Sequence, residues 1–272
     1  MEKIKIENNT VSETLIIPLY GRAHCSKKYS EVFFEPEAER IVECLDYDFS
    51  ALNYKEFTMI TWALRKKMLC DKAKEYLKEH PKATIVNLGC GADVSFASVD
   101  NGQCRFINLD LPEVIAVREK MVSCSDREKN VAMDAFNTAW FDEVETSPED
   151  GLYVISGGVF MYFDEEVLRK LFIKLALRFP GGGICFDACN MAGLKKSNRI
   201  VKKSGNTGAP IKLAVNNAEK MFIPWSKNFK KVNTVLELPQ EMKDAKSVPT
   251  ISKIILKLGL KMKMIQIVEI MF

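Results

Sequence analysis

The order of hydrophobic and polar residues changes about one third of the way along the chain. Phe57 and Ile60 belong to a set of apolar residues that recur at helical spacing through residues 56–77, and Pro81 follows the end of this pattern. We therefore expect residues 1–80 to be mainly helical and residues 81–272 to contain strands as well as helices.

From residue 84 onward, short apolar runs alternate with amphipathic helical patterns. The predicted strands cover residues 84–88, 104–111, 130–136, 151–156 and 183–189, followed by two late strands at 230–238 and 261–270. The predicted helices cover residues 112–124, 164–179 and 248–259. This alternation is typical of an α/β fold with right-handed crossovers and a largely parallel sheet, and the two late strands suggest an antiparallel hairpin that closes it.

A polar stretch rich in Gly, Asn and Lys follows the fifth strand. Residues 193–210 read "GLKKSNRIVKKSGNTGAP", and this composition predicts a loop or mobile lid. We expect one structural unit overall, in which residues 1–80 cap a domain formed by residues 81–272.

The stretch "TIVNLGCGAD" at residues 84–93 predicts a ligand-binding turn after the first strand of the sheet. Gly89 and Gly91 remove side chains at the carboxyl end of this strand, so that a ligand can approach the backbone. Val94 occupies the position of the third glycine in the dinucleotide fingerprint, which disfavours a pyrophosphate and leaves a smaller nucleoside ligand compatible. Asp110, at the end of the second strand, is placed to accept hydrogen bonds from ribose hydroxyls, and Asp134, after the third, to accept one from an adenine amino group.

Four segments carry a resemblance to a known family. The segments "SETLIIPLYGRA", "IVNLGCGAD", "NLDLPEVIAVREK" and "GGVFMYF" occur in this order. Together they resemble the class I S-adenosylmethionine-dependent methyltransferases of the leucine carboxyl methyltransferase superfamily, and in particular bacterial O-methyltransferases of the tetracenomycin polyketide type. The resemblance implies a seven-stranded Rossmann-like sheet with six parallel strands and one antiparallel strand.

The resemblance also implies a role for each matching residue. Arg65, with Arg22 as a second candidate, would bind the carboxylate of the cofactor, because a guanidinium forms a bidentate pair with a carboxylate. The methionine part would lie on the backbone of the glycine turn, the ribose on the second strand and the adenine after the third. The full predicted cofactor set is Arg22, Arg65, Gly89, Cys90, Gly91, Asp110, Leu111, Asp134, Ala135 and Ser156.

Three positions depart from the family pattern. Ser95 and Ser98 stand where the family often has arginine, and Gly157 stands where the carboxyl methyltransferases often have glutamate. The departure at Gly157 disfavours methylation of a protein carboxyl terminus and fits the small-molecule branch better.

Methyl transfer from a sulfonium needs positioning and exclusion of water more than it needs a reactive protein group. A carboxylate acceptor requires no base, whereas a hydroxyl acceptor is helped by one. We identify His24 and Tyr162 as candidate catalytic residues, and Asp187 as a further side chain at the mouth of the site.

Composition limits the alternatives. The chain has 272 residues, a net charge of +3, eight cysteines without a C-x-x-C pair and two histidines, which gives no reason to expect a metal site or nucleic acid. No secretory signal or membrane-spanning run is evident, so we expect a cytoplasmic protein with a small-molecule partner and no membrane partner. The oligomeric state is left open by the sequence.

Three hypotheses about function follow from these observations. The first is an S-adenosylmethionine-dependent O-methyltransferase that acts on a hydroxyl or carboxyl group of a small molecule and releases S-adenosylhomocysteine. The second, which the missing arginines keep open, is a non-catalytic protein that only binds S-adenosylmethionine or S-adenosylhomocysteine. The third, which Val94 disfavours, is a nicotinamide-dependent oxidoreductase.

Overall fold

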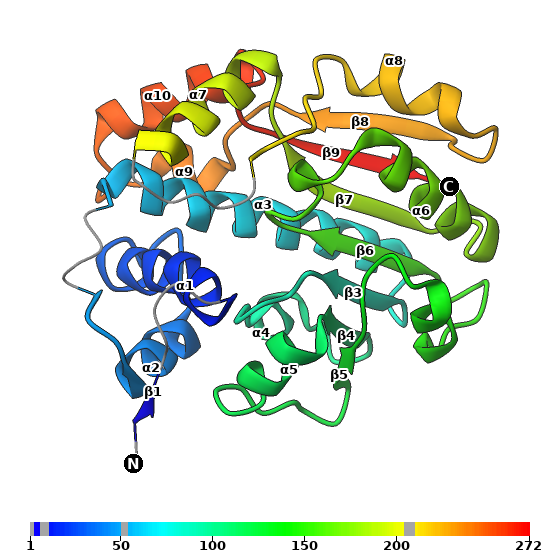
Figure 1. Cartoon of the computed structure of the whole chain (residues 1–272), viewed down its shortest axis with the longest axis horizontal. Helices are drawn as coiled ribbons and strands as arrows, with labels where there is room; N and C mark the ends of the chain where they lie inside the picture. Colours follow the sequence, from blue (N-terminus) through cyan, green and yellow to red (C-terminus); the bar gives the residue numbers. More distant parts are fainter. Residues whose placement is uncertain (1–2, 6–10, 50–53, 204–209) are drawn as a thin grey trace.

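The computed structural model describes residues 3–5, 11–49, 54–203 and 210–272. In this part of the chain, seven strands form one sheet in the order β5-β4-β3-β6-β7-β9-β8 (Figure 1). The strands are β3 (Thr84–Leu88), β4 (Arg105–Asp110), β5 (Glu128–Ala132), β6 (Leu152–Ser156), β7 (Gly183–Ala188), β8 (Lys231–Val235) and β9 (Gln266–Met271). The last strand, β9, lies between β7 and β8 and is antiparallel to both, while the other strands run parallel. The α/β fold class, the seven-stranded sheet and the late antiparallel strand are therefore confirmed.

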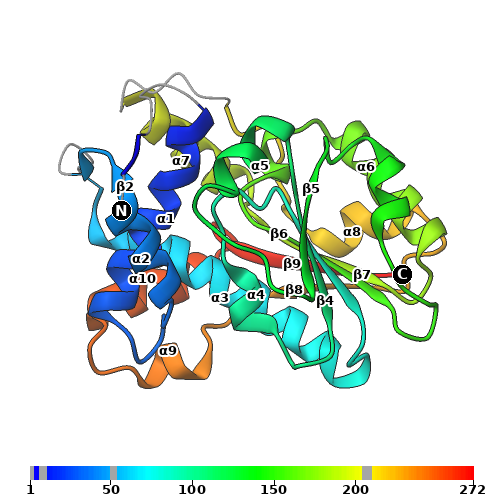
Figure 2. The ribbon, with the colours of Figure 1, turned by 90° about the horizontal axis from the view of Figure 1, so that it is seen from below.

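Helices cover both faces of this sheet and extend beyond one end of it (Figure 2). The longer ones are α1 (Val11–Lys28), α2 (Pro36–Cys44), α3 (Glu56–Glu79), α5 (Pro112–Arg118), α6 (Glu165–Arg178), α7 (Met191–Lys203) and α10 (Thr250–Lys261). Shorter ones are α4 (Ser95–Val99), α8 (Ala218–Phe222) and α9 (Gln240–Asp244), with 3-10 turns η2 (Thr138–Glu143), η3 (Phe160–Tyr162) and η4 (Ile223–Trp225). A two-residue pair, β1 (Ile4–Lys5) and β2 (Leu45–Asp46), accompanies the first helices. Residues 11–49 are thus mainly helical, as the sequence predicts.

The hydrophobic core is divided by the sheet. Side chains of α3, α9 and α10 pack on one face of the sheet, and side chains of η2, α6 and α8 pack on the other. A third cluster joins α1 and α2 to Ala92 and Val94 in the turn after β3. The N-terminal helices are therefore anchored to the loop that follows the first strand of the large sheet.

Several predicted boundaries are wrong. The third strand, predicted at 130–136, lies at 128–132, and the last strand, predicted at 261–270, begins only at residue 266 because α10 continues to Lys261. The helix expected at residues 112–124 ends at Arg118, because residues 119–121 leave the helix in a turn. Residues 193–203, expected to be part of a loop, belong to α7, whose amphipathic pattern in "MAGLKKSNRIVKK" is helical. The remainder of the predicted lid, residues 204–209, lies outside the described residues, so a lid function stays a prediction. Among the described residues, no helix is both long and apolar enough to cross a lipid bilayer.

Phe172 on α6 connects the aromatic side chains of the second core. Its fully buried ring packs against Phe160, Phe186 and Phe222, with ring centroids 5.1 to 6.2 Å apart. Phe172→Ala is expected to lower the free energy of unfolding by about 3–5 kcal/mol, since it leaves a cavity in a closely packed cluster. Chemical denaturation measures this loss. Leu177→Ala, on the same helix but 64% exposed, is the control and should change stability by less than about 0.5 kcal/mol.

Candidate active site

The turn after β3 lies at the carboxyl edge of the sheet and is held by Asp110 at the end of β4. One carboxylate oxygen of Asp110 accepts a hydrogen bond from Gly91 N at 2.8 Å, and the other accepts one from Leu111 N at 2.8 Å. Burial raises the pKa of Asp110, although these two backbone donors act in the opposite direction. Because each carboxylate oxygen can accept more than one hydrogen bond, the oriented Asp110 still has acceptor capacity for a ligand.

Gly89 and Gly91 both have a left-handed backbone, with φ of +70° and +50°. Glycine tolerates this conformation without steric cost. A Cβ on Gly89 would also collide with the side chain of Val159, which follows β6. The turn thus needs glycine at residue 89 both for its conformation and for the close approach of Val159.

Arg65 projects from α3 to the same edge of the sheet, over the ends of β6 and β7. Its Nη1 lies 3.2 Å from Oδ2 of Asp187, and Oδ1 of Asp187 accepts a hydrogen bond from Gly158 N at 2.6 Å. A Cβ on Gly158 would lie 3.2 Å from Nη2 of Arg65, so the guanidinium rests directly on this glycine. Arg65 is therefore fixed in position but still one-fifth exposed at its side chain.

Tyr162, in η3, is 37% exposed and lies close enough to Arg65 and Asp187 for both charges to act on its hydroxyl. Burial of its hydroxyl raises the pKa of Tyr162, with a further contribution from Asp187 that Arg65 opposes. Tyr162 is therefore a neutral phenol at physiological pH, suited to donate a hydrogen bond rather than to act as a phenolate base.

The turn after β5 presents the other group of predicted cofactor residues. Asp134 is exposed, and its Oδ1 accepts a hydrogen bond from Phe136 N at 2.9 Å. The carbonyl of Ala135 accepts one from the indole of Trp140 at 2.9 Å. Leu111, 39% exposed, adds an apolar side chain immediately after Asp110. These contacts fix the turn. The second carboxylate oxygen of Asp134 takes no part in the hydrogen bond from Phe136 N.

Two of the predicted cofactor residues have buried side chains. The hydroxyl of Ser156 is buried and donates to the carbonyl of Leu88 at 2.9 Å, which ties the end of β6 to the end of β3. Cys90 is also buried, and burial raises the pKa of its thiol well above the ordinary range. Both side chains are therefore buried beneath the candidate site, and a contact of either with the cofactor remains a prediction.

Arg118, at the end of α5, supports the glycine turn from behind. Its guanidinium is fully buried and donates to the carbonyls of Gly91, at 3.0 Å, and Asp93, and its Nε donates to Asn130. The sequence analysis missed Arg118. The available signal was its position: with Val114 and Ile115 it occupies the buried face of the helix, where an unpaired arginine is not tolerated.

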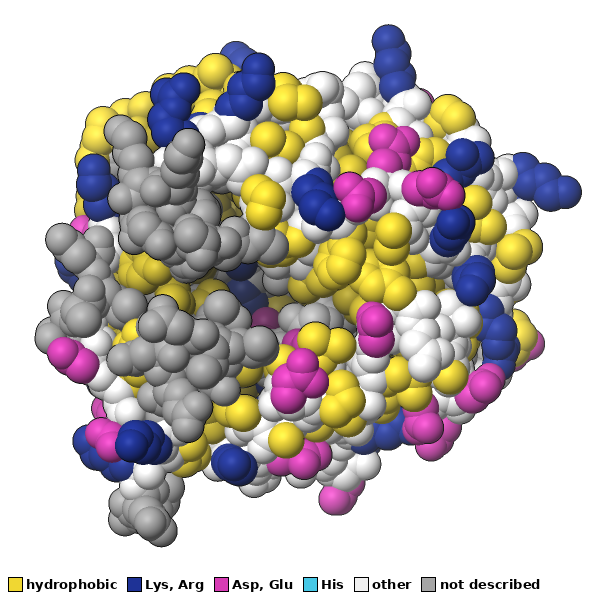
Figure 3. Space-filling view, viewed as in Figure 1, with side chains coloured by type: hydrophobic (Ala, Val, Ile, Leu, Met, Phe, Trp, Pro, Cys, Tyr) yellow, Lys and Arg dark blue, Asp and Glu magenta, His cyan; other side chains and the backbone are white. Residues whose placement is uncertain are grey.

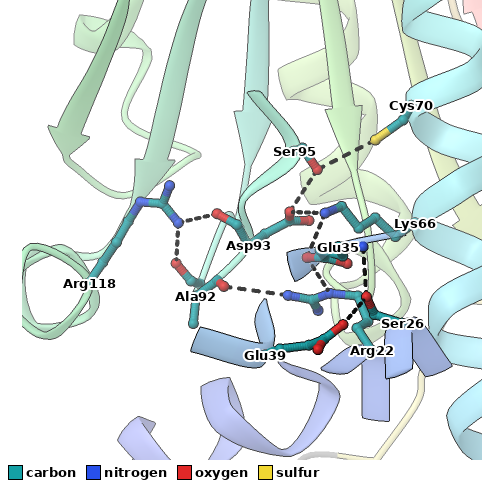
Figure 4. Close-up of polar contacts among 11 residues, drawn as sticks. Arg22, Ser26, Glu35, Glu39, Lys66, Cys70, Ala92, Asp93, Ser95 and Arg118 are labelled. Carbon is teal, nitrogen blue, oxygen red and sulfur yellow. Dashed lines mark hydrogen bonds and ion pairs between the residues drawn. The ribbon is translucent and has the colours of Figure 1, made fainter. Parts of the chain in front are cut away.

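A buried cluster of charges joins the N-terminal helices to the same turn (Figure 4). Arg22 on α1 lies 3.2 Å from Glu35, and Lys66 on α3 lies 2.7 Å from Glu35 and 3.3 Å from Asp93. Arg22 also donates to the carbonyl of Ala92 at 3.4 Å. We refer to Arg22, Glu35, Lys66 and Asp93 as the buried charge cluster. Arg22, predicted to bind an anion of the cofactor or substrate, therefore has a protein carboxylate as its partner, and the predicted role stays untested.

Ser95, which stands where the family that the sequence resembles often has arginine, contacts the buried charge cluster. Ser95 is buried and donates a hydrogen bond to Asp93 at 2.7 Å, while Lys66 brings a positive charge to the same carboxylate from α3. Burial by itself lowers the pKa of Lys66, but Asp93 and Glu35 raise it above its ordinary value, so the ammonium stays charged. The cation beside Asp93 therefore comes from Lys66 on α3 and not from residue 95.

His24, predicted as a candidate base, lies on α1 with its Nε2 3.6 Å from Oε1 of Glu56 at the start of α3. Glu56 also accepts a hydrogen bond from Tyr29 at 2.6 Å. These contacts give His24 a place in the interface between two helices, and a catalytic role stays a prediction.

Figure 3 shows a hollow in the molecular surface at this edge of the sheet. A separate cavity of about 130 Å³ lies at the opposite, amino edge, where it is lined by Thr84, Arg105 and Glu145 among others. The candidate site residues lie at the carboxyl edge, where ligands of open α/β sheets bind. We therefore place the site at the carboxyl edge.

Comparison with known proteins agrees with this geometry. The chain is 26% identical over 202 residues to the tetracenomycin polyketide synthesis O-methyltransferase TcmP of Streptomyces glaucescens, which covers 72% of this chain and 73% of TcmP. A methyltransferase from Thermobifida fusca superposes with a TM-score of 0.54 at 12% identity, covering 92% of this chain and 93% of its own. A DUF574 family protein from Streptomyces avermitilis superposes with a TM-score of 0.55 at 11% identity, covering 93% and 96%. No family model matches the chain.

The sheet order, the glycine turn and the acidic residue after β4 define the class I methyltransferase fold. Within that class, the chain is similar in sequence to TcmP, and this similarity together with the shared fold indicates an enzyme, a methyltransferase that uses S-adenosylmethionine as its cofactor.

The buried charge cluster predicts how stability depends on pH. Burial would raise the pKa of Asp93, but Lys66, Arg22 and the Ser95 hydroxyl hold it at about 2, below its ordinary value of 3.8. A carboxylate with a lowered pKa stabilises the folded state above the unfolded-state value, and this contribution is lost as pH falls from about 4 to 2. The Asp93 carboxylate thus contributes about 2 kcal/mol to the free energy of unfolding at neutral pH. Asp93→Asn should therefore be less stable than the wild type at pH 7, and the difference should shrink towards pH 2.

Urea denaturation between pH 2 and 7 measures this difference. Asp142→Asn, an exposed aspartate in η2, is the matched control and should follow the wild type throughout. An unchanged stability of Asp93→Asn at pH 7 would contradict the role assigned to Asp93.

Proposed function

We propose that this chain transfers a methyl group from S-adenosylmethionine to a hydroxyl or carboxyl oxygen of a small-molecule acceptor. The single observation that carries the proposal is the arrangement of Asp110 and Arg65 on either side of the glycine turn. S-adenosylmethionine has a ribose near one end and an amino-acid carboxylate at the other, and these two residues have the matching chemistry.

The ribose end is supported by the orientation of Asp110. Backbone N–H groups of Gly91 and Leu111 hold its two oxygens at 2.8 Å each, so the carboxylate does not need to reorganise when a sugar binds. Ribose offers two neighbouring hydroxyl donors, and a carboxylate can accept both. The side chains of Leu111 and Asp134 would then contact the apolar face and the amino group of the adenine.

The amino-acid end is supported by the position of Arg65. The guanidinium lies beside Asp187 on β7, and Asp110 ends β4, with β3 and β6 between these strands in the sheet. Two to three strand spacings correspond to roughly 10–14 Å. This span suits an extended ligand with a sugar that Asp110 would bind and a carboxylate that Arg65 would bind.

The bound cofactor would supply an electrophilic methyl group. The acceptor oxygen forms a bond to this methyl group as the carbon–sulfur bond breaks, and a hydroxyl acceptor also releases a proton. The chain's own contribution is to orient the acceptor and exclude water. Tyr162, as a neutral phenol beside Arg65, would donate a hydrogen bond that positions the acceptor, which agrees best with a carboxylate or an already acidic hydroxyl.

Cofactor binding gives the first test. Arg65→Gln and Asp110→Asn are each expected to raise the dissociation constant for S-adenosylhomocysteine about 10- to 100-fold, because each removes a charged hydrogen-bond partner. Isothermal titration calorimetry measures this change. Arg105→Gln, an exposed arginine at the amino end of β4, should bind as the wild type does. No binding of S-adenosylhomocysteine by the wild-type chain would refute the proposal.

Methyl transfer gives the second test. With methyl-labelled S-adenosylmethionine, the chain is expected to label an oxygen in a panel of phenols, alcohols and carboxylic acids. With an acceptor that reacts, Tyr162→Phe should lower turnover about tenfold, since one hydrogen bond to the acceptor is lost. Its affinity for S-adenosylhomocysteine should stay within about threefold of the wild type. Tight cofactor binding with labelling on nitrogen or sulfur instead of oxygen would overturn the O-methyltransferase assignment.

A further inference from the structure

The helix α10 has a hydrophobic face that is turned to solvent. Ile251, Ile254, Ile255, Leu258 and Met262 recur at helical spacing along α10 and the residue after it, and they are between 43% and 63% exposed. The opposite face of the helix packs on the hydrophobic core, where Leu256 and Leu260 are fully buried beside α3. Contiguous exposed apolar residues of this kind mark an interaction surface. We refer to these five residues as the α10 face.

The charge of the sequence segment that contains α10 is one-sided. Residues 245–268 contain five lysines and no acidic residue, and residues 188–218 contain six lysine or arginine residues and no acidic residue. The whole chain has a net charge of +3, so these two segments carry +11 and the remaining sequence carries −8. Lys257 and Lys261 are exposed on α10 itself. The partner of this surface should therefore be anionic.

The second basic segment adjoins α10 in space. The amide and side chain of Asn190 donate to the carbonyls of Lys263 and Met262, at 2.8 Å each, so α7 begins against the end of α10. Lys195, Lys196 and Arg199 are exposed along α7. Apolar and basic side chains are interleaved over this upper part of the molecule in Figure 3.

An apolar stripe flanked by lysines is the pattern of a helix that lies in the interface of an anionic membrane. The 12 residues of α10 span about 18 Å, too short to cross a bilayer, so the helix can only lie along its surface. A second copy of the chain fits less well, because a twofold contact on this face would bring Lys257 and Lys261 near the same lysines of the other copy.

We propose, contrary to the expectation from the sequence that the chain has no membrane partner, that the α10 face and the adjoining start of α7 dock on an anionic lipid surface. The apolar side chains enter the headgroup region, and the lysines and arginine pair with anionic headgroups. This docking does not depend on the proposed function. One consequence of docking does rest on the proposed function. The chain runs from α10 into β9, where Gln266 pairs with Ala188, the residue after Asp187. A docked chain would therefore hold the carboxyl edge of the sheet beside the membrane, which would favour apolar acceptors.

Vesicle flotation with the full-length chain tests the proposal. The chain is expected to bind vesicles of phosphatidylcholine with about one-third phosphatidylglycerol at least about tenfold more strongly than vesicles of phosphatidylcholine alone, and binding should weaken as salt is added. Equal binding to both vesicles, or binding to neither, would overturn it.

Two pairs of variants locate the surface. Leu258→Asp on the α10 face should reduce binding to the anionic vesicles at least about tenfold, whereas Leu177→Asp on α6, exposed to a similar degree, should not. The double variant Lys257→Glu with Lys261→Glu should have a comparable effect, whereas Lys170→Glu with Lys174→Glu on α6, which changes the net charge equally, should have little.

Two further measurements separate this proposal from the alternatives. Circular dichroism and calorimetric binding of S-adenosylhomocysteine should be unchanged in Leu258→Asp, which shows that the variant is folded and that docking is separate from cofactor binding. Light scattering in solution should give the same mass for Leu258→Asp and the wild type. A wild-type dimer that this substitution dissociates would show instead that the α10 face joins two copies of the chain.

Discussion

The site depends on one constraint, which is that the turn between β3 and α4 must keep its left-handed glycine conformation without being filled by side chains. Protein groups hold this turn from three directions. Asp110 accepts from its backbone, Arg118 donates to its carbonyls, and the buried charge cluster approaches it through Asp93. A ligand that binds here meets a surface already fixed by these contacts, so little conformational entropy is lost on binding.

The buried charge cluster also explains why the chain carries its N-terminal helices. Buried ion pairs seldom add much net stability, because removing two charges from water costs about as much as their attraction returns. A buried charge whose partner is missing does, however, destabilise the folded state strongly, because nothing compensates for its loss of hydration. With Arg22 on α1, Lys66 on α3 and Glu35 just before α2, the cluster can be satisfied only when all three helices meet the glycine turn. The cluster thus specifies a geometry more than it supplies energy.

Ser95 stands where the resemblance to the methyltransferases predicts an arginine, and a cation from another helix lies beside Asp93. Lys66 reaches this carboxylate from α3, and Ser95 contributes a hydrogen bond in place of a charge. The same helix presents Arg65 one residue earlier at the edge of the site. A shift of α3 would therefore disturb the support of the turn and the predicted cofactor contact together, which couples the N-terminal segment to the site.

The α/β class, the order of the strands along the chain, and the glycine turn with Asp110 could all be predicted from the amino-acid sequence, because periodicity, glycine and the end of a strand are local signals. Which charges lie next to one another follows only from the folded structure. Nothing in the local pattern distinguishes Lys66 from a solvated surface cation, and the position of Arg118 on the apolar face of its helix predicts burial without naming its partners. Only the packing of distant segments brings both side chains beside Asp93. The outward apolar face of α10 was equally hidden, since an amphipathic pattern predicts a helix without showing which of its faces finds a partner.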